Sequence, residues 1–217
     1  MANYKFYMTP GSCSTGIHIL LEELDLVFEV YPINLMAGDQ FKPEFLAINP
    51  RGSVPVLVTP DGTTLTTYQS ISCWLAEKFP DSNLIPKEEG DDKARVMGVM
   101  NYACNKLHGE GFTRIFTTER YSIDESETEA VLAQGRNIIE RGFAKVNALL
   151  AEERTFVLDQ FTIADTALFY VEFWAEHGGI PLPEYCRIHF ARMLKRPTVR
   201  QVLMEEGYAR FLSRYDS

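Results

Sequence analysis

Hydrophobic and polar residues follow two different periods in the first part of the chain. Residues 4–8 (YKFYM) alternate as in a β-strand, and residues 27–33 (VFEVYPI) alternate again. Between them, residues 17–24 place isoleucine and leucine at the i, i+3, i+4 and i+7 positions of a one-sided helix. These three segments predict a βαβ unit.

The following segments predict a hairpin and a closing helix. A short helical piece is expected near residues 44–47. VPVLVT (54–59) and TTLT (63–66) flank the turn residues Pro60-Asp61-Gly62, a pattern typical of a β-hairpin. A helix over about 68–79 completes the order βαβαββα, which predicts a small mixed sheet with helices packed on it.

The pattern changes after residue 80. From Pro80 to about Asp92 the composition shifts to Pro, Asp, Ser, Asn, Lys and Glu, as in linkers between domains. We therefore expect an α/β domain over 1–80, a linker over 81–92 and an all-α bundle over 93–217. The helices of the bundle are predicted at 93–117, 125–152, 163–177, 184–195 and 198–208.

Charge and composition exclude several classes of protein. The chain has 217 residues and a formal net charge of −9 without a basic cluster, which argues against a nucleic-acid partner. No apolar run is long enough for a membrane helix. MANYKFYMTP has no basic region or apolar core of a signal peptide, so we expect a cytoplasmic protein with reduced cysteines.

The spacing of cysteines and histidines gives no sign of a cofactor. The four cysteines, at 13, 73, 104 and 186, and the four histidines, at 18, 108, 177 and 189, form none of the spacings typical of metal ligands. Glycine-rich phosphate-binding motifs are absent as well. Neither a metal nor a nucleotide cofactor is expected.

Cys13 is the candidate for chemistry. Ser12 or Ser14 is a good N-cap for the helix that follows, which places Cys13 where unpaired backbone N–H groups and the helix dipole favour a thiolate and lower the pKa of a cysteine. The alternative is a buried structural thiol. Cys73 and Cys104 lie within apolar helical faces and are expected in the core.

Two other motifs bear on the local backbone structure. The Val54-Pro55 dipeptide opens a strand, where proline is a turn or edge residue; its peptide bond is either trans or, with the Val54 backbone then exposed to pair with an extended chain, cis. Thr162 and Asp165 have the spacing of a capping box at the start of a helix. We assign the capping box no catalytic role.

Taken together, five motifs resemble the cytosolic glutathione transferase family, and most closely its bacterial beta class. They are PGSCS, NPRGSVPVL, LTTYQSISCWLAEKFPD, KLHGEGF and FTIADTALF, and they span nearly the whole chain. The resemblance implies a thioredoxin-like N-terminal domain, an all-helical C-terminal domain and a homodimer. It also implies glutathione as co-substrate and a small hydrophobic electrophile as second substrate, bound by the helical domain.

The resemblance also assigns roles to residues. Cys13 corresponds to the cysteine that holds the glutathione sulfur, with Ser12 and Ser14 beside it. Val54 corresponds to the residue whose backbone pairs with glutathione, followed by the family's cis proline at Pro55. His108 corresponds to a histidine that projects toward the same sulfur, although the residues alone favour a core or solvated histidine.

The chain departs from the family where the γ-glutamyl group of glutathione binds. The family commonly has Glu-Ser at this point, and this chain has Thr67-Tyr68. We therefore expect the group to be recognised by hydroxyls of Thr67 and Tyr68, by Gln69, or by Ser70. A basic residue expected after Met36 is replaced by Ala37-Gly38.

Two functions are compatible with these features. The first is a glutathione transferase or glutathione-dependent thiol–disulfide exchange enzyme, in which a thiolate attacks an electrophilic carbon or a disulfide. The second is a non-catalytic member of the same fold that binds a protein partner, for which the replaced ligand residues argue. Cys13 and His108 stand at matching positions and favour the enzyme.

Overall fold

The computed structural model describes residues 3–151 and 154–215. Contacts divide the chain into two compact units. The first consists of Met1–Ile85 together with Met193–Ser217, and the second of Pro86–Arg192. The division between Ile85 and Pro86 falls inside the segment expected to be a linker.

A four-stranded sheet forms the centre of the first unit, with the strand order β2-β1-β3-β4. β1 (Tyr4–Met8) and β2 (Phe28–Pro32) run parallel, with Tyr4 opposite Phe28. β3 (Val56–Val58) is antiparallel to both β1 and β4 (Thr64–Leu65). The predicted βαβ unit and hairpin are confirmed.

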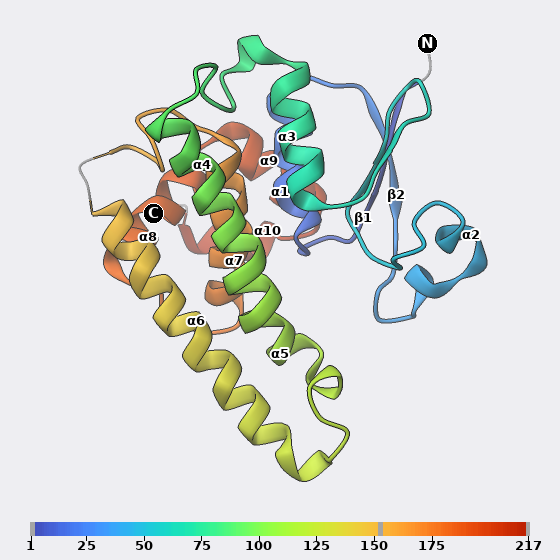
Figure 1. Cartoon of the computed structure of the whole chain (residues 1–217), viewed down its shortest axis with the longest axis vertical. Coiled ribbons are helices and arrows are strands. Elements are labelled where there is room, and N and C mark those ends of the chain that lie inside the picture. The colour runs from blue at the N-terminus through green and yellow to red at the C-terminus, as the bar shows by residue number, and fades with distance from the viewer. Residues whose placement is uncertain (1–2, 152–153, 216–217) are drawn as a thin grey trace. The chain divides into compact units, whose positions relative to one another are not determined.

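Helices α1 (Ser14–Glu23) and α3 (Tyr68–Lys78) pack against each other beside this sheet (Figure 1). Every residue of α1 from Ser14 to Leu21 is buried, because this helix packs on α3 and α9 and the ring of His18 contacts Phe6 and Phe28 of the sheet. The short helix α2 (Pro43–Leu46) lies between β2 and β3 in the sequence.

The C-terminal helices belong to the first unit. α9 (Pro197–Glu205) buries Val199, Val202 and Leu203 and packs on α1, and α10 (Ala209–Leu212) follows it. Just before α9, the guanidinium of Arg196 donates two hydrogen bonds, of 3.0 and 2.7 Å, to the carboxylate of Glu23. The compact units therefore differ from the expected division, which placed all of residues 93–217 in one helical domain.

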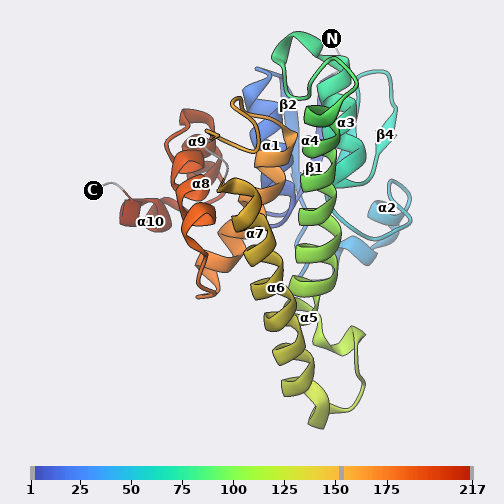
Figure 2. The same cartoon turned by 60° about the vertical axis from the view of Figure 1, so that its left-hand side comes forward.

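The second unit is helical. A continuous helical path runs through α4 (Asp91–Asn101), the π-helix η3 (Tyr102–Phe112) and α5 (Thr113–Phe116). α6 (Thr128–Leu150) runs alongside η3 and α5, as Figures 1 and 2 show. α7 (Ile163–His177) and most of α8 (Glu184–Leu194) complete the unit, so the predicted helical segments are confirmed over the described residues; position 152, the end of one predicted helix, lies outside them.

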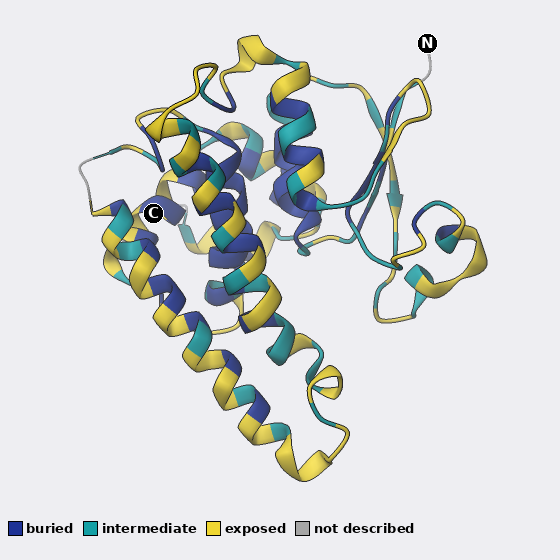
Figure 3. Cartoon of the chain, viewed as in Figure 1, coloured by how far each residue is buried: buried dark blue, intermediate teal, exposed yellow. Residues whose placement is uncertain are grey.

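Helix α7 forms much of the core of the second unit. Its residues from Ile163 to Phe173 are all buried, in contrast to α6, which shows one buried and one exposed face (Figure 3). Across the described ranges, no helix combines the length and apolar character needed to span a bilayer. Single 3₁₀ turns occur at Asp39–Phe41, Pro80–Ser82, Thr118–Arg120, Glu125–Glu127 and Ser213–Tyr215.

Candidate active site

Cys13 and Val54, which the sequence placed in separate motifs, lie together in the first unit. Cys13 is the N-cap residue of α1, and its thiol donates a hydrogen bond to the backbone carbonyl of Val54, with Sγ 3.6 Å from the oxygen. The Val54–Pro55 peptide bond is cis, which settles the alternative left open by the sequence. The thiol and the strand-opening backbone are therefore neighbours.

The N–H groups of the first turn of α1 are not directed as expected. The N–H of Ser14 donates to Oγ of Ser12 at 3.1 Å, and the N–H of Thr15 donates to the carbonyl of Ser12 at 3.1 Å. Ser12 is thus the residue that satisfies the end of the helix, and the hydroxyl of the fully buried Ser14 lies 2.9 Å from Oγ of Ser12. These pairings correct the expectation of free N–H donors around the sulfur.

Exposure does not distinguish Cys13 from the other cysteines. Cys13 and Cys104 are each 8% exposed, and Cys186 is fully buried. Cys73, which was expected in the core, is half-buried and is the most accessible of the four. Any selective reactivity of Cys13 has to come from its place at the end of α1.

The segment that replaces Glu-Ser serves mainly as a helix cap. Thr67 is the N-cap of α3, and its Oγ1 accepts a hydrogen bond from the N–H of Ser70 at 3.1 Å and lies 2.7 Å from the Ser70 hydroxyl. Tyr68 is only 4% exposed, whereas Gln69 is half-buried. A contact of these residues with glutathione remains a prediction.

His108 lies on the π-helix η3 of the second unit. Its Nδ1 is 3.3 Å from the hydroxyl of Tyr170, and its ring meets that of Trp174 edge-on, with centroids 4.8 Å apart. Burial lowers the pKa of His108 to about 4, so the imidazole is neutral at pH 7 and can accept a hydrogen bond. Cys13 belongs to the first unit, so the approach of His108 to its sulfur also remains a prediction.

An aromatic cluster drawn from three helical segments includes the two rings that contact His108, those of Tyr170 and Trp174. Trp174 of α7 contacts Tyr170, Phe112 and Phe116 with centroid separations of 5.0, 5.2 and 5.1 Å. Phe116 is 56% exposed, so part of the cluster faces solvent. The sequence did not predict this cluster, because its members lie about 60 residues apart and only the packing of α7 on η3 brings them together.

A buried carboxylate holds the chain on both sides of Cys13. The side chain of Glu206 is 2% exposed; it accepts hydrogen bonds from the N–H of Gly11 at 2.8 Å and from the hydroxyl of Thr15 at 2.7 Å. Its other oxygen lies 3.0 Å from Nδ1 of His18. Sequence reasoning missed this residue, and no local pattern could have found it, since its partners are some 190 positions away.

The capping box at Thr162 is confirmed and extends into a buried ionic network. Asp165 accepts hydrogen bonds from the N–H of Thr162 at 2.7 Å and of Val157 at 2.8 Å. The ring of His189 bridges Asp165, at 3.1 Å, and Glu172, at 2.8 Å, with both carboxylates fully buried. Burial alone would lower the pKa of His189, but the charge of Glu172 and the two hydrogen bonds raise it to about 10.

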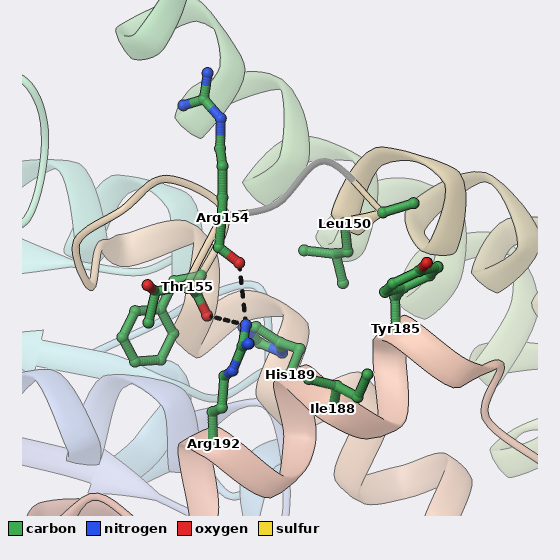
Figure 4. A pocket seen from close by; sticks show the side chains of 9 residues that line it. Leu150, Arg154, Thr155, Tyr185, Ile188, His189 and Arg192 are labelled. Carbon is green, nitrogen blue, oxygen red and sulfur yellow. Dashed lines mark hydrogen bonds between the residues drawn. The ribbon is translucent and has the colours of Figure 1, made fainter.

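A cavity of about 430 Å³ beside His189 is a second candidate for a binding site (Figure 4). Arg154 and Arg192 line it, but both cations already have partners. Arg192 donates to the carbonyls of Arg154 and Thr155 at 3.0 and 2.7 Å, and Arg154 pairs with Asp92 at 3.3 Å. We therefore assign no anion to this cavity.

Comparisons with known proteins agree with the fold. A family model for the glutathione S-transferase N-terminal domain matches residues 11–78, and one for the C-terminal domain matches residues 129–185. Glutathione S-transferase GstA of Escherichia coli O157:H7 is 33% identical over 210 residues, which cover 94% of this chain and 98% of the relative. The chain belongs to the glutathione S-transferase family.

Solved structures of glutathione transferases share the architecture of this chain. A glutathione transferase homologue from Sulfitobacter, crystallised with bound glutathione, superposes with a TM-score of 0.86 at 25% identity and covers 94% of this chain and 99% of its own. A bacterial beta class glutathione S-transferase from Sphingomonas chungbukensis has a TM-score of 0.80 at 24% identity, covering 94% and 100%. At 24% identity, the likeness to the Sphingomonas chungbukensis protein shows a shared fold. The expected fold class, a thioredoxin-like domain with a helical domain, is confirmed.

Proposed function

We propose that the protein is a glutathione transferase in which Cys13 carries out glutathione-dependent thiol–disulfide exchange. The observation that carries this proposal is the contact of the Cys13 thiol with the Val54 carbonyl at the start of α1. An extended peptide that pairs with the Val54 backbone brings its own cysteine next to Cys13. A glutathione transferase homologue that was crystallised with bound glutathione covers 94% of this chain, which supports glutathione as the ligand.

The exchange reaction proceeds in two steps. The Cys13 thiolate attacks the glutathionyl sulfur of a mixed disulfide, so that a Cys13–glutathione disulfide forms and the substrate leaves as a thiolate that takes up a proton. The thiolate of a second glutathione then attacks the glutathionyl sulfur. Glutathione disulfide leaves, and the Cys13 thiolate is regenerated. The proton of the incoming glutathione thiol passes to solvent, and the neutral imidazole of His108, whose pKa of about 4 makes it a weak base, is proposed to accept a hydrogen bond from that thiol.

Conjugation is the second reaction of the proposal. Here the glutathione thiolate attacks an electrophilic carbon and displaces a leaving group or adds to a double bond. The aromatic cluster of Phe112, Phe116, Trp174 and Tyr170 favours an apolar, planar electrophile, since aromatic rings pack on one another face to face, as Phe112 and Phe116 do, or edge to face, as Trp174 does with Phe112 and Tyr170. Because the relatives are glutathione transferases, we also propose a homodimer and a location in the cytoplasm.

Two measurements test the proposed function. Isothermal titration with reduced glutathione is expected to show binding, and a glutathione–hydroxyethyl mixed disulfide is expected to be reduced catalytically. Cys13→Ala should abolish exchange while the protein stays folded. Cys73→Ala, which alters the most accessible cysteine, is the matched control and should retain activity within about twofold. Equal activity of wild type and Cys13→Ala contradicts the assignment.

The alternative is a non-catalytic member of the family that binds a protein partner. It is favoured by the segment at residues 67–68, where the Thr67 hydroxyl is committed to capping α3 and Tyr68 is buried. Neither residue supplies the carboxylate usual at that position. A folded protein that fails to bind glutathione at millimolar concentration would favour this alternative.

A further inference from the structure

We propose that the first unit contains a binding site for a divalent transition metal of the zinc type, formed by His18, Glu22 and Glu205. The site joins α1 to α9 and involves neither Cys13 nor a residue assigned to glutathione. It therefore does not depend on the proposed function. The transferase reaction needs no metal, and the proposed role of the site is to stabilise the contact of α1 with α9.

The donor atoms already lie close together. One atom each from His18, Glu22 and Glu205 can be chosen so that all lie within 4.8 Å of one another. His18 and Glu22 are one turn apart on the same face of α1, and Glu205 is the last residue of α9, which packs on α1. An imidazole nitrogen with two carboxylates is a ligand set that zinc accepts, whereas magnesium and calcium prefer oxygen alone.

The ring of His18 has the hydrogen-bond arrangement that is usual for a histidine ligand of a metal. Its side chain is 5% exposed, and Nδ1 lies 3.0 Å from the carboxylate of Glu206. A histidine that donates its Nδ1 proton to a carboxylate presents a bare Nε2 to a metal. Nε2 of His18 lies 3.4 Å from a carboxylate oxygen of Glu205 and makes no hydrogen bond among the described residues.

The supporting residues are themselves fixed. Glu206 is held by the N–H of Gly11 and the hydroxyl of Thr15. The side-chain amide of Gln201 donates to Glu22 at 3.2 Å and to Glu205 at 3.0 Å, and so keeps the two carboxylates together. Two adjacent carboxylates repel each other unless a cation lies between them, and a divalent ion neutralises both.

Space for the ion and its water is available. His18, Glu22 and Glu205 line one side of a cavity of about 540 Å³. Ligand atoms around a tetrahedral zinc, with bonds of about 2.0–2.1 Å, lie about 3.3 Å apart, so the donor atoms have to close in by up to about 1.5 Å. The side chain of Glu205 is 47% exposed and is free to make most of this movement.

The test is titration of the metal-free protein with ZnCl₂, followed by calorimetry and by thermal unfolding. We expect one zinc ion per chain and a midpoint of unfolding that rises with zinc concentration. Glu205→Gln and Glu22→Gln should each weaken binding at least tenfold. Glu77→Gln, an exposed helical glutamate of the same unit, should bind zinc as the wild type does. Cys13→Ala should also bind it unchanged, because the thiol is no ligand.

Three results would overturn the proposal. One is the absence of stoichiometric binding at micromolar zinc. The second is equal affinity in Glu205→Gln, Glu22→Gln and Glu77→Gln, which would mean scattered surface binding. The third is loss of binding in Cys13→Ala, which would assign the metal to the thiol. Far-UV circular dichroism of each variant shows whether a loss of binding reflects unfolding.

Discussion

At the scale of single residues, the candidate chemistry depends on where Cys13 lies rather than on how open it is. The sequence predicted its place before α1 and the importance of Val54, because both follow from short motifs. It did not predict that Oγ of Ser12 would accept a hydrogen bond from the N–H of Ser14. The direction of a first-turn N–H depends on side-chain rotamers, which spacing does not determine.

The buried carboxylate of Glu206 gives a prediction at this scale. Glu206→Ala removes the carboxylate that accepts from the N–H of Gly11 and the hydroxyl of Thr15 and that lies beside Nδ1 of His18. We expect a loss of unfolding free energy on the order of 3 kcal/mol, measured by urea denaturation with EDTA present. Glu205→Ala, at the neighbouring and half-exposed position, should cost less than about 1 kcal/mol. Similar losses in the two variants would show that Glu206 does not hold this loop.

At the scale of elements, periodicity predicted every long helix, since apolar faces at helical spacing are local features. It did not predict that the path from Tyr102 to Phe112 is a π-helix, nor how closely η3, α5 and α6 approach. Three glycines permit this approach. A Cβ added at Gly135 would lie 2.9 Å from Cβ of Arg114 and 3.1 Å from the carbonyl of Gly111, and Gly111 and Gly142 are similarly crowded.

Two alanine substitutions with opposite expected effects test this packing. Gly135→Ala should destabilise the protein by about 1–3 kcal/mol, because backbone and a Cβ atom cannot move aside as a flexible side chain can. Gly98→Ala, on the exposed face of α4 with no atom within 4 Å of the added Cβ, should stabilise it by about 0.5–1 kcal/mol. Denaturant midpoints measure both, and stabilisation by both substitutions would contradict the close approach.

The network of His189 with Asp165 and Glu172 predicts that the stability of the second unit depends on pH. The pKa of His189 is raised to about 10 in the folded protein, against about 6.5 for an unperturbed histidine. Its contribution is therefore complete below pH 6.5 and is lost as the pH rises toward 10, at up to about 1.4 kcal/mol per pH unit. Burial also raises the pKa of Glu172, so this carboxyl group likewise makes the folded protein less stable as the pH rises, over a lower pH range than His189 does.

The difference in unfolding free energy between wild type and His189→Gln measures this contribution. At pH 7 the variant should be less stable by about 3–5 kcal/mol, because two buried carboxylates lose their cation. The difference should shrink between pH 7 and 10. His177→Gln, at an exposed position of α7, is the control and should show a small, constant difference. A constant difference for His189→Gln would mean that its ring is neutral in the folded state.

At the scale of the whole molecule, the C-terminal segment completes the first unit. The sequence predicted helix α9 but assigned it to the helical domain, because its contact with α1 joins residues some 180 positions apart. Such pairings leave no trace in local periodicity. The carboxylate of Glu23 accepts from Arg196 and also from the hydroxyl of Thr198, so this contact is polar at its start and apolar along α9.

The two tryptophans report on the two units separately, since Trp74 lies in α3 and Trp174 in α7. In proteins that keep one tryptophan each, Arg196→Gln should shift the Trp74 unfolding transition by about 1.5–3 kcal/mol. The Trp174 transition should shift less. Lys195→Gln, one residue earlier and exposed, should shift neither transition. A larger shift at Trp174 would contradict the assignment of α9 to the first unit.

The central claim is that the end of α1 makes Cys13 a reactive thiol, and the rate of its alkylation tests this most directly. Iodoacetamide at pH 7, with peptide mass spectrometry of the products, gives the labelling rate of each cysteine. We expect Cys13 to react at least tenfold faster than Cys73, although Cys73 is the more accessible. Glutathione should slow the alkylation of Cys13 and leave the rates of the other cysteines unchanged. A Cys13 that reacts no faster than Cys73 and is indifferent to glutathione would be a structural thiol, and the account would be wrong.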